Sequence, residues 1–261
     1  LGQNFLTARN ILEEIVDAAE IESGVIEVGP GFGVLTSELA QNSDKVVTIE
    51  IDERLIDVLD YTLAEYDNVK IINEDILKLD LKKVIDDEFN GEKVSIAANL
   101  PYYITTPIIT KLLEEKLPIK NIVVMVQKEV AERMSAKPST KDYGAITVLC
   151  QYYTEPSIVA NVPASLFVPP PKVDSAVLKL KVLDKPSVEV KDEGVFFRVV
   201  KAAFSQRRKT LLNCLSANFP IPKDEISTLL ESIGIAPSRR GETLSLKEFA
   251  NIADTLLQKI K

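Results

Sequence analysis

Short apolar runs alternate with longer amphipathic segments through the first half of the chain. The apolar runs cover 25–29, 46–50, 69–73, 94–98 and 122–126. Segments with helical periodicity lie at 8–20, 34–40, 54–66, 79–89 and 107–115. Strands that alternate with helices form a parallel sheet with helices packed against it. The sequence therefore predicts a doubly wound α/β fold.

The pattern changes after residue 127. Two further strands are expected at 157–162 and 175–182, and the second alternates apolar with polar residues, which favours antiparallel pairing. From residue 195 onward only helical periodicity remains, with helices expected at 195–204, 208–217, 223–233 and from Ser245, where Glu248 completes a capping-box spacing. We therefore predict a Rossmann-like, mostly parallel sheet of seven strands in a domain of residues 1–183. A smaller all-helical domain of residues 184–261 follows it.

Charge is distributed unevenly between these two parts. The chain carries 31 basic and 39 acidic side chains, a net charge of −8. Residues 1–180 hold 17 basic and 29 acidic side chains, whereas residues 181–261 hold 14 and 10. The change of sign supports the domain boundary, and a locally basic part of an acidic protein can bind nucleic acid.

The chain contains no histidine, which excludes several kinds of site. Histidine general bases, Ser-His-Asp triads and histidine-ligated zinc are ruled out, and we expect no metal.

Cys150 and Cys214 lie in apolar surroundings, and we expect two buried free thiols. No apolar run reaches the ~18 residues of a membrane span. No signal peptide is recognisable, so we expect a cytoplasmic protein without a membrane partner.

A glycine-rich turn follows the first apolar strand. Gly29 and Gly31, within Glu27–Gly33, allow the backbone to approach a ligand closely. Glu50 ends the second strand, 21 residues after Gly29, where a carboxylate can bind ribose hydroxyls. Asp75 follows the third strand, where a carboxylate can accept a hydrogen bond from an adenine amine. Each feature alone has a purely structural explanation, but together they predict an adenosine-containing ligand. The tight turn lacks a phosphate-binding lysine, which favours S-adenosylmethionine over NAD or ATP.

The segment Asn99-Leu-Pro-Tyr102 follows the fourth strand. Pro101 fixes its own φ and disfavours helical backbone at Leu100, so we expect the chain to leave the strand in an extended step. The Asn99 amide and backbone carbonyls would then face a cleft, an arrangement that suits a planar nucleobase with an N–H donor. The alternative is a helix start, with Asn99 as its cap and Pro101 in its first turn.

With these segments placed, the chain resembles the ribosomal RNA adenine dimethyltransferases of the small-subunit (KsgA/RsmA) type. The resemblance covers nearly the whole chain and implies that the sheet is that of an S-adenosylmethionine-dependent methyltransferase. The matching segments are Leu1–Leu6, Glu27–Gly33, Ile49–Asp52, Asn73–Asp75, Asn99–Tyr103, Gln127–Glu129, Val168–Ser175, Phe204–Leu211 and Arg240–Ser245.

The resemblance assigns cofactor contacts to matching positions. Asn4 and Leu6 would close over S-adenosylmethionine, and Gly29 would lie against its methionine part. Glu50 would bind the ribose hydroxyls and Asp75 the adenine amine. The residues alone would have predicted a frayed terminus at Asn4 and Leu6.

The same resemblance implies dimethylation of the 6-amino group of adenosines, two adjacent ones, in small-subunit (16S) rRNA during ribosome biogenesis. Asn99 would lie between the cofactor and the target and contact both. We expect the Asn99 side-chain carbonyl and the Leu100 backbone carbonyl to accept the N–H bonds of the target amine. Tyr102 would stack on one face of the base and Phe167 on the other, unless Phe167 is a core residue. We expect Tyr103 to pack rather than to take part in chemistry.

Basic residues cluster in the helical part. We expect Arg207, Arg208 and Lys209 to open a helix, and Arg239 and Arg240 to lie in a later turn. Such groups are often only solvated, but the resemblance favours contacts with the phosphates of rRNA in the small subunit or its precursor.

We expect a monomer. The alternatives are a large-subunit rRNA adenine methyltransferase of the antibiotic-resistance type and a non-catalytic ribosome assembly or transcription factor on the same fold.

Overall fold

The computed structural model describes residues 5–6 and 8–260, and the chain divides into two compact units. The sheet unit runs to Ala131 and resumes over Glu155–Leu183. The helical unit comprises Glu132–Thr154 and the chain from Asp184 onward. Residues 132–154, which we had placed in the sheet domain, thus group with the helices.

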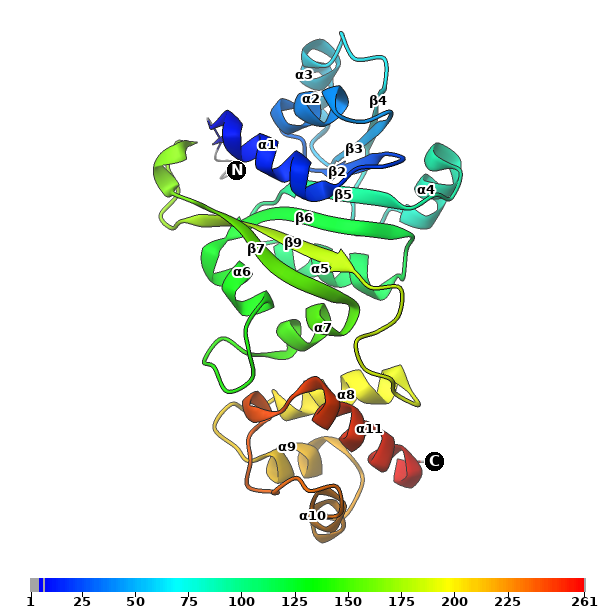
Figure 1. Cartoon of the computed structure of the whole chain (residues 1–261), viewed down its shortest axis with the longest axis vertical. Helices are drawn as coiled ribbons and strands as arrows, with labels where there is room; N and C mark the ends of the chain where they lie inside the picture. Colours follow the sequence, from blue (N-terminus) through cyan, green and yellow to red (C-terminus); the bar gives the residue numbers. More distant parts are fainter. Residues whose placement is uncertain (1–4, 7, 261) are drawn as a thin grey trace. The chain divides into compact units, whose positions relative to one another are not determined.

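The sheet unit is built on seven strands in the order β4-β3-β2-β5-β6-β9-β7 (Figure 1). The strands are β2 (Val25–Val28), β3 (Val46–Glu50), β4 (Val69–Asn73), β5 (Val94–Asn99), β6 (Ile119–Gln127), β7 (Thr154–Val162) and β9 (Ser175–Val182). Neighbouring strands from β4 to β6 are parallel, and β9 pairs antiparallel with β6. The predicted α/β fold, its seven strands and the antiparallel strand are confirmed.

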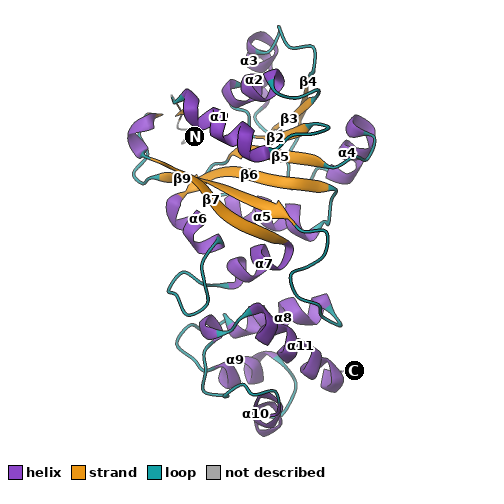
Figure 2. Cartoon of the chain, in the orientation of Figure 1, coloured by secondary structure: helices purple, strands orange, loops and turns teal. Residues whose placement is uncertain are grey.

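Helices alternate with these strands and cover the sheet (Figure 2). They are α1 (Arg9–Ala19), α2 (Val34–Gln41), α3 (Ile56–Thr62), α4 (Leu81–Phe89), α5 (Thr105–Glu114) and α6 (Lys128–Met134). Every residue of β2 and β3 is buried, because parallel strands covered on both faces bury all their side chains. No helix within residues 8–260 is long and apolar enough to cross a lipid bilayer.

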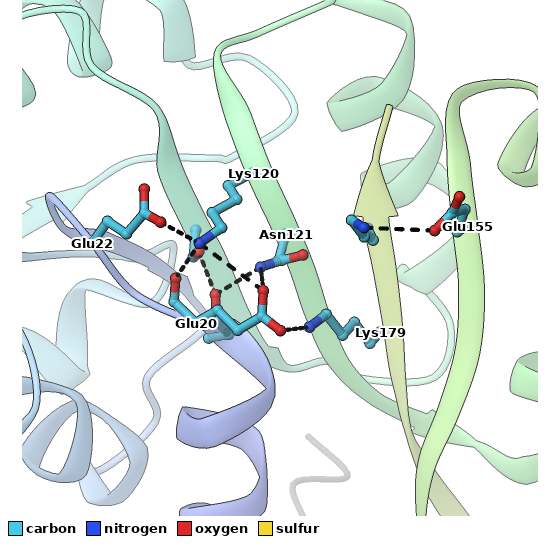
Figure 3. A network of polar contacts seen from close by, with 9 residues as sticks. Glu20, Glu22, Lys120, Asn121, Glu155 and Lys179 are labelled. Atoms are coloured by element: carbon cyan, nitrogen blue, oxygen red, sulfur yellow. Dashed lines mark hydrogen bonds and ion pairs between the residues drawn. The ribbon is translucent and has the colours of Figure 1, made fainter. Parts of the chain in front are cut away.

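α1 is fixed to the sheet by a polar network at its C-terminal end (Figure 3). The carbonyl oxygen of Ala19 accepts hydrogen bonds from Ser95 Oγ at 2.6 Å and Asn121 Nδ2 at 3.0 Å. Lys179 Nζ of β9 lies 2.6 Å from Glu20 Oε1, and this hydrogen bond is the main cause that lowers the pKa of Glu20. These contacts join the C-terminal end of α1 to β5, β6 and β9.

The helical unit contains α7 (Ala145–Tyr153), α8 (Glu193–Ala203), α9 (Leu211–Asn218), α10 (Lys223–Ser232) and α11 (Leu246–Ile260). Tyr152 stacks on Phe196 with ring centroids 4.8 Å apart, which ties α7 to α8 and explains why residues 132–154 belong to this unit. The predicted capping box is confirmed: Ser245 N donates to Glu248 Oε2 at 2.8 Å, and Glu248 N donates to Ser245 Oγ at 3.3 Å.

The start of α9 differs from the prediction. Thr210 caps this helix by accepting a hydrogen bond from Asn213 N, so the helix begins at Leu211 rather than at Arg208. Arg207, Arg208 and Lys209 therefore lie in the turn before α9 and do not open it.

Candidate active site

A cavity of about 450 Å³ opens at the carboxyl ends of β2, β3 and β5. Its size is within the range of small-molecule sites, ~300–1,000 Å³. Seven residues expected in the active site line this one cavity: Gly29, Glu50, Asp75, Asn99, Leu100, Tyr102 and Phe167. The topology explains why, because the carboxyl ends of parallel strands meet at one edge of a sheet.

The glycine turn forms one wall of the cavity. Gly29 and Gly31 have φ of +71° and +59°, a region that side-chain-bearing residues rarely adopt. A Cβ added at either position would meet nothing within 4 Å, so the backbone here borders open space. Gly29 N donates to Ile49 O at 2.9 Å, which holds the turn against the end of β3. The turn thus presents bare backbone to a ligand.

Two carboxylates lie beside this turn. Glu50 is buried, and its Oε1 accepts from Asp52 N at 2.9 Å while Oε2 accepts from Gly31 N at 3.4 Å. Asp75 Oδ1 accepts from Leu77 N at 2.9 Å. Each carboxylate keeps lone pairs for further donors, since an ionised carboxylate accepts about four hydrogen bonds.

Glu27 is a functional candidate that the sequence analysis did not identify. It is buried in β2 and lines the cavity. Oε2 accepts from Thr36 Oγ1 at 2.5 Å and Thr48 Oγ1 at 3.2 Å, while Oε1 is buried without a partner in the described part of the chain. Burial raises the pKa of Glu27 to about 7, against the lowering effect of the two hydroxyls. The sequence feature that could have identified it is a single charged residue inside the apolar run Val25–Val28.

The segment from Asn99 to Tyr102 leaves the sheet without starting a helix. Asn99 is the last residue of β5, and α5 begins only at Thr105, so Asn99 is not a helix cap. Leu100 N donates to Met125 O at 3.3 Å, which continues the ladder to β6 for one more residue. The side-chain amide of Asn99 has no hydrogen-bond partner among residues 8–260. It is available to a ligand in the cavity.

Tyr102 is held in place by β9, because its hydroxyl lies 3.0 Å from the Oγ of the buried Ser175. Tyr103 was expected to pack, but this is wrong: its side chain is 82% exposed at the rim of the cavity. Phe32 and Ile51, 42% and 65% exposed, stand at the same rim. An exposed apolar rim around a cavity is typical of a binding site.

Phe167 is both a core residue and part of the cavity wall. It is 3% exposed and belongs to the core cluster that includes Leu12, Ile15 and Val177. Its strand β8 (Phe167–Val168) pairs antiparallel with β1 (Phe5–Leu6), which aligns Leu6 with Phe167. The backbone of Leu6 is therefore next to a cavity-lining residue. Asn4 lies outside the described residues.

The predicted RNA-binding residues all lie in the helical unit. Arg207, Arg208 and Lys209 are exposed. Arg239 is engaged internally: it forms an ion pair with Glu248 and donates from Nε to Thr243 Oγ1 at 3.1 Å. Arg240 is exposed, with its Nη1 3.9 Å from a carboxylate oxygen of Glu242. The five residues thus differ in how much charge they leave uncompensated.

A family model described as "Ribosomal RNA adenine dimethylase" matches residues 1–258. The chain belongs to this family. "Ribosomal RNA small subunit methyltransferase A" of Bacillus mycoides (strain KBAB4) is 55% identical over 98% of this chain and 90% of that protein. The protein of the same name from Bacillus cereus (strain B4264) has the same identity and coverage.

Two solved structures are also similar to this member of the dimethylase family. A dimethyladenosine transferase from Plasmodium falciparum is 30% identical, covers 95% of both chains and has a TM-score of 0.78. The 23S rRNA methyltransferase ErmE is 27% identical, covers 98% of this chain and 100% of its own, and has a TM-score of 0.73.

As a member of this family, the protein is a methyltransferase, and its cofactor is S-adenosylmethionine. The cavity fits this group in three respects. The glycine turn leaves space that a Cβ would fill, the carboxylates of Glu50 and Asp75 suit hydroxyl and amine donors, and the unpaired Glu27 Oε1 suits a cationic ligand. No group of three or more Cys, Asp or Glu side chains suited to a metal ion occurs among the described residues.

Proposed function

We propose that this dimethylase methylates the 6-amino group of adenosines in small-subunit rRNA, twice on each of two adjacent nucleotides, during ribosome biogenesis. One observation carries the proposal: a single cavity brings the carboxylates of Glu50 and Asp75 together with the Asn99–Tyr102 segment. The residues proposed to bind the cofactor and those proposed to bind the target amine therefore line the same cavity, which supports group transfer between them. The names of relatives that are 55% identical favour the small subunit.

Separate residues would hold each part of the cofactor. Glu50 would accept from the ribose hydroxyls, and Asp75 from the adenine amine. Gly29 would lie against the methionine part, with Asn4 and Leu6 closing over it. When bound there, S-adenosylmethionine supplies a methyl group on a positively charged sulfur.

Asn99 and Leu100 would prepare the target nitrogen. The lone pair of the 6-amino group is delocalised into the adenine ring, so this nitrogen is a poor nucleophile. The Asn99 side-chain carbonyl and the Leu100 backbone carbonyl would each accept a hydrogen bond from one N–H group of this nitrogen. These two hydrogen bonds would draw the nitrogen toward tetrahedral geometry. The dipoles of the two carbonyls also face the positive charge that develops on the nitrogen. Rate then comes from position and electrostatics.

No strong base is needed from the chain, because the methylated nitrogen is cationic and loses its proton readily to water. A second methylation places an amine with only one N–H bond in the same site, which leaves one acceptor unused. The site must therefore hold an added methyl group as well as the bare amine.

Aromatic side chains would hold the base. Tyr102, anchored through Ser175, would stack on one face, and Phe167, which also lines the cavity, is our candidate for the other. Stacking of this kind contributes ~1–3 kcal/mol per base. The exposed ring of Tyr103 adds apolar surface at the mouth.

The two parts of the chain would divide the work. In this proposal the sheet unit is the catalytic part, and the helical unit, residues 132–154 and 184–261, is the RNA-binding part. Arg207, Arg208, Lys209 and Arg240 would contact phosphates, with Arg239 supporting the turn that carries Arg240. We propose a cytoplasmic monomer that acts on rRNA within the small subunit or its precursor.

The test is methylation of purified subunits with labelled S-adenosylmethionine. Small and large subunits from cells that lack this protein are incubated with the enzyme, and nucleosides are analysed by mass spectrometry. We expect N6,N6-dimethyladenosine in small-subunit rRNA, at two adjacent positions by primer extension. Label in large-subunit rRNA alone would favour the activity named for ErmE. Absence of label in both would refute catalysis on rRNA.

A further inference from the structure

Three separate segments of the helical unit come together on its surface. They are the loop 135–143, the turn 205–210 before α9 and the turn 239–242 before α11. Together they carry seven basic and two acidic side chains. We call the six exposed basic residues of these segments the basic surface: Lys137, Lys141, Arg207, Arg208, Lys209 and Arg240. In the sequence, the loop is more than 60 residues from either turn.

Hydrogen bonds connect each of the three segments to the other two. Arg207 Nη2 donates to the carbonyl oxygen of Lys141 at 3.0 Å. Ser139 N donates to the carbonyl oxygen of Glu242 at 2.7 Å. Leu211 N, directly after the 205–210 turn, donates to Arg239 O at 2.6 Å. The contacts form a closed ring, so the segments hold one another in a fixed arrangement.

Packing beneath the ring keeps it in place. Tyr143 at the end of the loop is buried, edge-on to Phe204 with ring centroids 6.0 Å apart. A Cβ at Gly241 would lie 2.6 Å from the carbonyl oxygen of Ala203, so only glycine lets this turn approach the end of α8. The basic surface is therefore preformed, and little conformational entropy is lost when a ligand binds.

The positive charge of this surface is largely uncompensated. Lys137, Lys141, Arg208 and Lys209 form no side-chain hydrogen bond or ion pair within the described part of the chain. By contrast, Lys45 and Lys70 of the sheet unit both pair with Glu88. Bare ammonium and guanidinium groups in a fixed array suit a partner with closely spaced negative charges, as in an RNA backbone.

We propose that the loop 135–143 is part of the RNA-binding surface, and that Lys137 and Lys141 contact phosphates of folded RNA beside Arg207, Arg208 and Lys209. This rests on the proposed function for the identity of the RNA, but not for the phosphate contacts. It assigns to RNA binding a loop that lies outside the basic C-terminal part of the sequence. An acidic protein partner would not show the salt dependence of counterion release from RNA.

The test measures full-length protein binding to a fluorescent RNA hairpin across ~50–200 mM salt. The variant is Lys137→Gln with Lys141→Gln. The matched control is Lys185→Gln with Lys191→Gln, which removes two exposed, unpaired lysines of the same unit outside the basic surface. The far-UV circular dichroism spectrum and the urea unfolding midpoint serve as folding checks for both proteins.

We expect the loop variant to bind the hairpin more weakly. In a plot of the logarithm of the binding constant against the logarithm of the salt concentration, the slope should become shallower by roughly 0.7–0.9 for each phosphate that the variant no longer neutralises. The control should keep the wild-type slope. An unchanged slope in the loop variant, or an equal decrease in the control, would overturn the proposal. Methylation of small subunits by the wild type is measured in parallel. Its failure would refute the proposed function and leave the slope result standing.

Discussion

At the scale of single residues, the two hydrogen bonds that Glu50 accepts from the backbone set how it should be tested. Replacement by alanine removes the proposed ribose contacts and also leaves the N–H groups of Gly31 and Asp52 without this acceptor. We expect Glu50→Ala to weaken S-adenosylmethionine binding at least tenfold, about 1.4 kcal/mol, by calorimetry. Glu50→Gln keeps the shape and one acceptor and should lose less affinity. Wild-type affinity in both variants would exclude the assignment.

Asn99 should separate chemistry from cofactor binding. Its side-chain amide has no partner within residues 8–260, so its removal leaves no protein group unpaired. We expect Asn99→Ala to abolish methylation of small subunits while S-adenosylmethionine affinity stays closer to wild type than in Glu50→Ala. Single-turnover methylation and calorimetry on the same preparation measure the two effects. Near-normal methylation by this variant would show that Asn99 does not hold the target amine.

Glu27 should make stability depend on pH. Burial raises its pKa from 4.5 to about 7, so the folded protein keeps this proton to higher pH than the unfolded chain does. Its contribution to stability is therefore fully present below about pH 4.5 and is lost as the pH rises through about 7. Between about pH 5 and pH 8, wild type should lose up to about 3 kcal/mol relative to Glu27→Gln. Urea unfolding of both proteins at the two pH values measures this, and parallel pH profiles would contradict it.

At the scale of elements, the β–α alternation could be predicted because each strand and helix of the sheet has its own periodicity. The amphipathic face of α1 and the cap of α11 were also readable, since both depend on neighbours in the sequence. α7 was not predicted, because its apolar and aromatic residues lack a clear polar face. Only tertiary contacts such as Tyr152 on Phe196 define it.

In the candidate site too, the residues placed by strand order could be predicted from the sequence, whereas the surroundings of other side chains could not. Gly29, Glu50 and Asp75 follow strands, and topology brings such residues together. The environment of Glu27 depends on Thr36 and Thr48 from α2 and β3, which no local pattern indicates. For the same reason, sequence did not show that Arg239 pairs with Glu248.

A side-chain hydrogen bond joins the segment between β5 and α5 to β9, a strand distant in the sequence. The hydroxyl of Tyr102 and the Oγ of Ser175 are 3.0 Å apart, and no other side-chain hydrogen bond of Tyr102 occurs in the described chain. We expect Tyr102→Phe to retain stacking but to lower kcat/KM for small subunits severalfold, because the ring is less well fixed. Ser175→Ala, which removes the other partner, should have a similar effect. Tyr102→Ala should reduce kcat/KM much more; equal reductions in all three would mean that the ring itself does not contact the base.

At the scale of the whole molecule, the sheet unit and the helical unit differ in charge as well as in fold. The sheet unit pairs many of its lysines with acidic neighbours, whereas the helical unit gathers uncompensated basic groups around one ring of hydrogen bonds. Affinity for RNA and affinity for cofactor should therefore be separable by mutation. The two functions depend on residues in different units.

The basic triplet tests this separation in full. Replacement of Arg207, Arg208 and Lys209 by glutamine should weaken binding to purified small subunits and lower the log–log salt slope by roughly 0.7–0.9 for each phosphate left without its basic partner. S-adenosylmethionine affinity should hardly change, because every described residue that lines the cavity belongs to the sheet unit.

Arg207 also holds the loop through Lys141 O, so its replacement should reduce the contribution of the loop lysines as well. The triple variant should therefore bind more weakly than the loop double variant. A triple control at exposed lysines elsewhere in the helical unit, Lys185, Lys191 and Lys223, removes the same charge and should keep most of the wild-type slope. If the two triple variants fall on the same salt line, net charge alone governs binding. The arrangement of the basic surface would then carry no specificity.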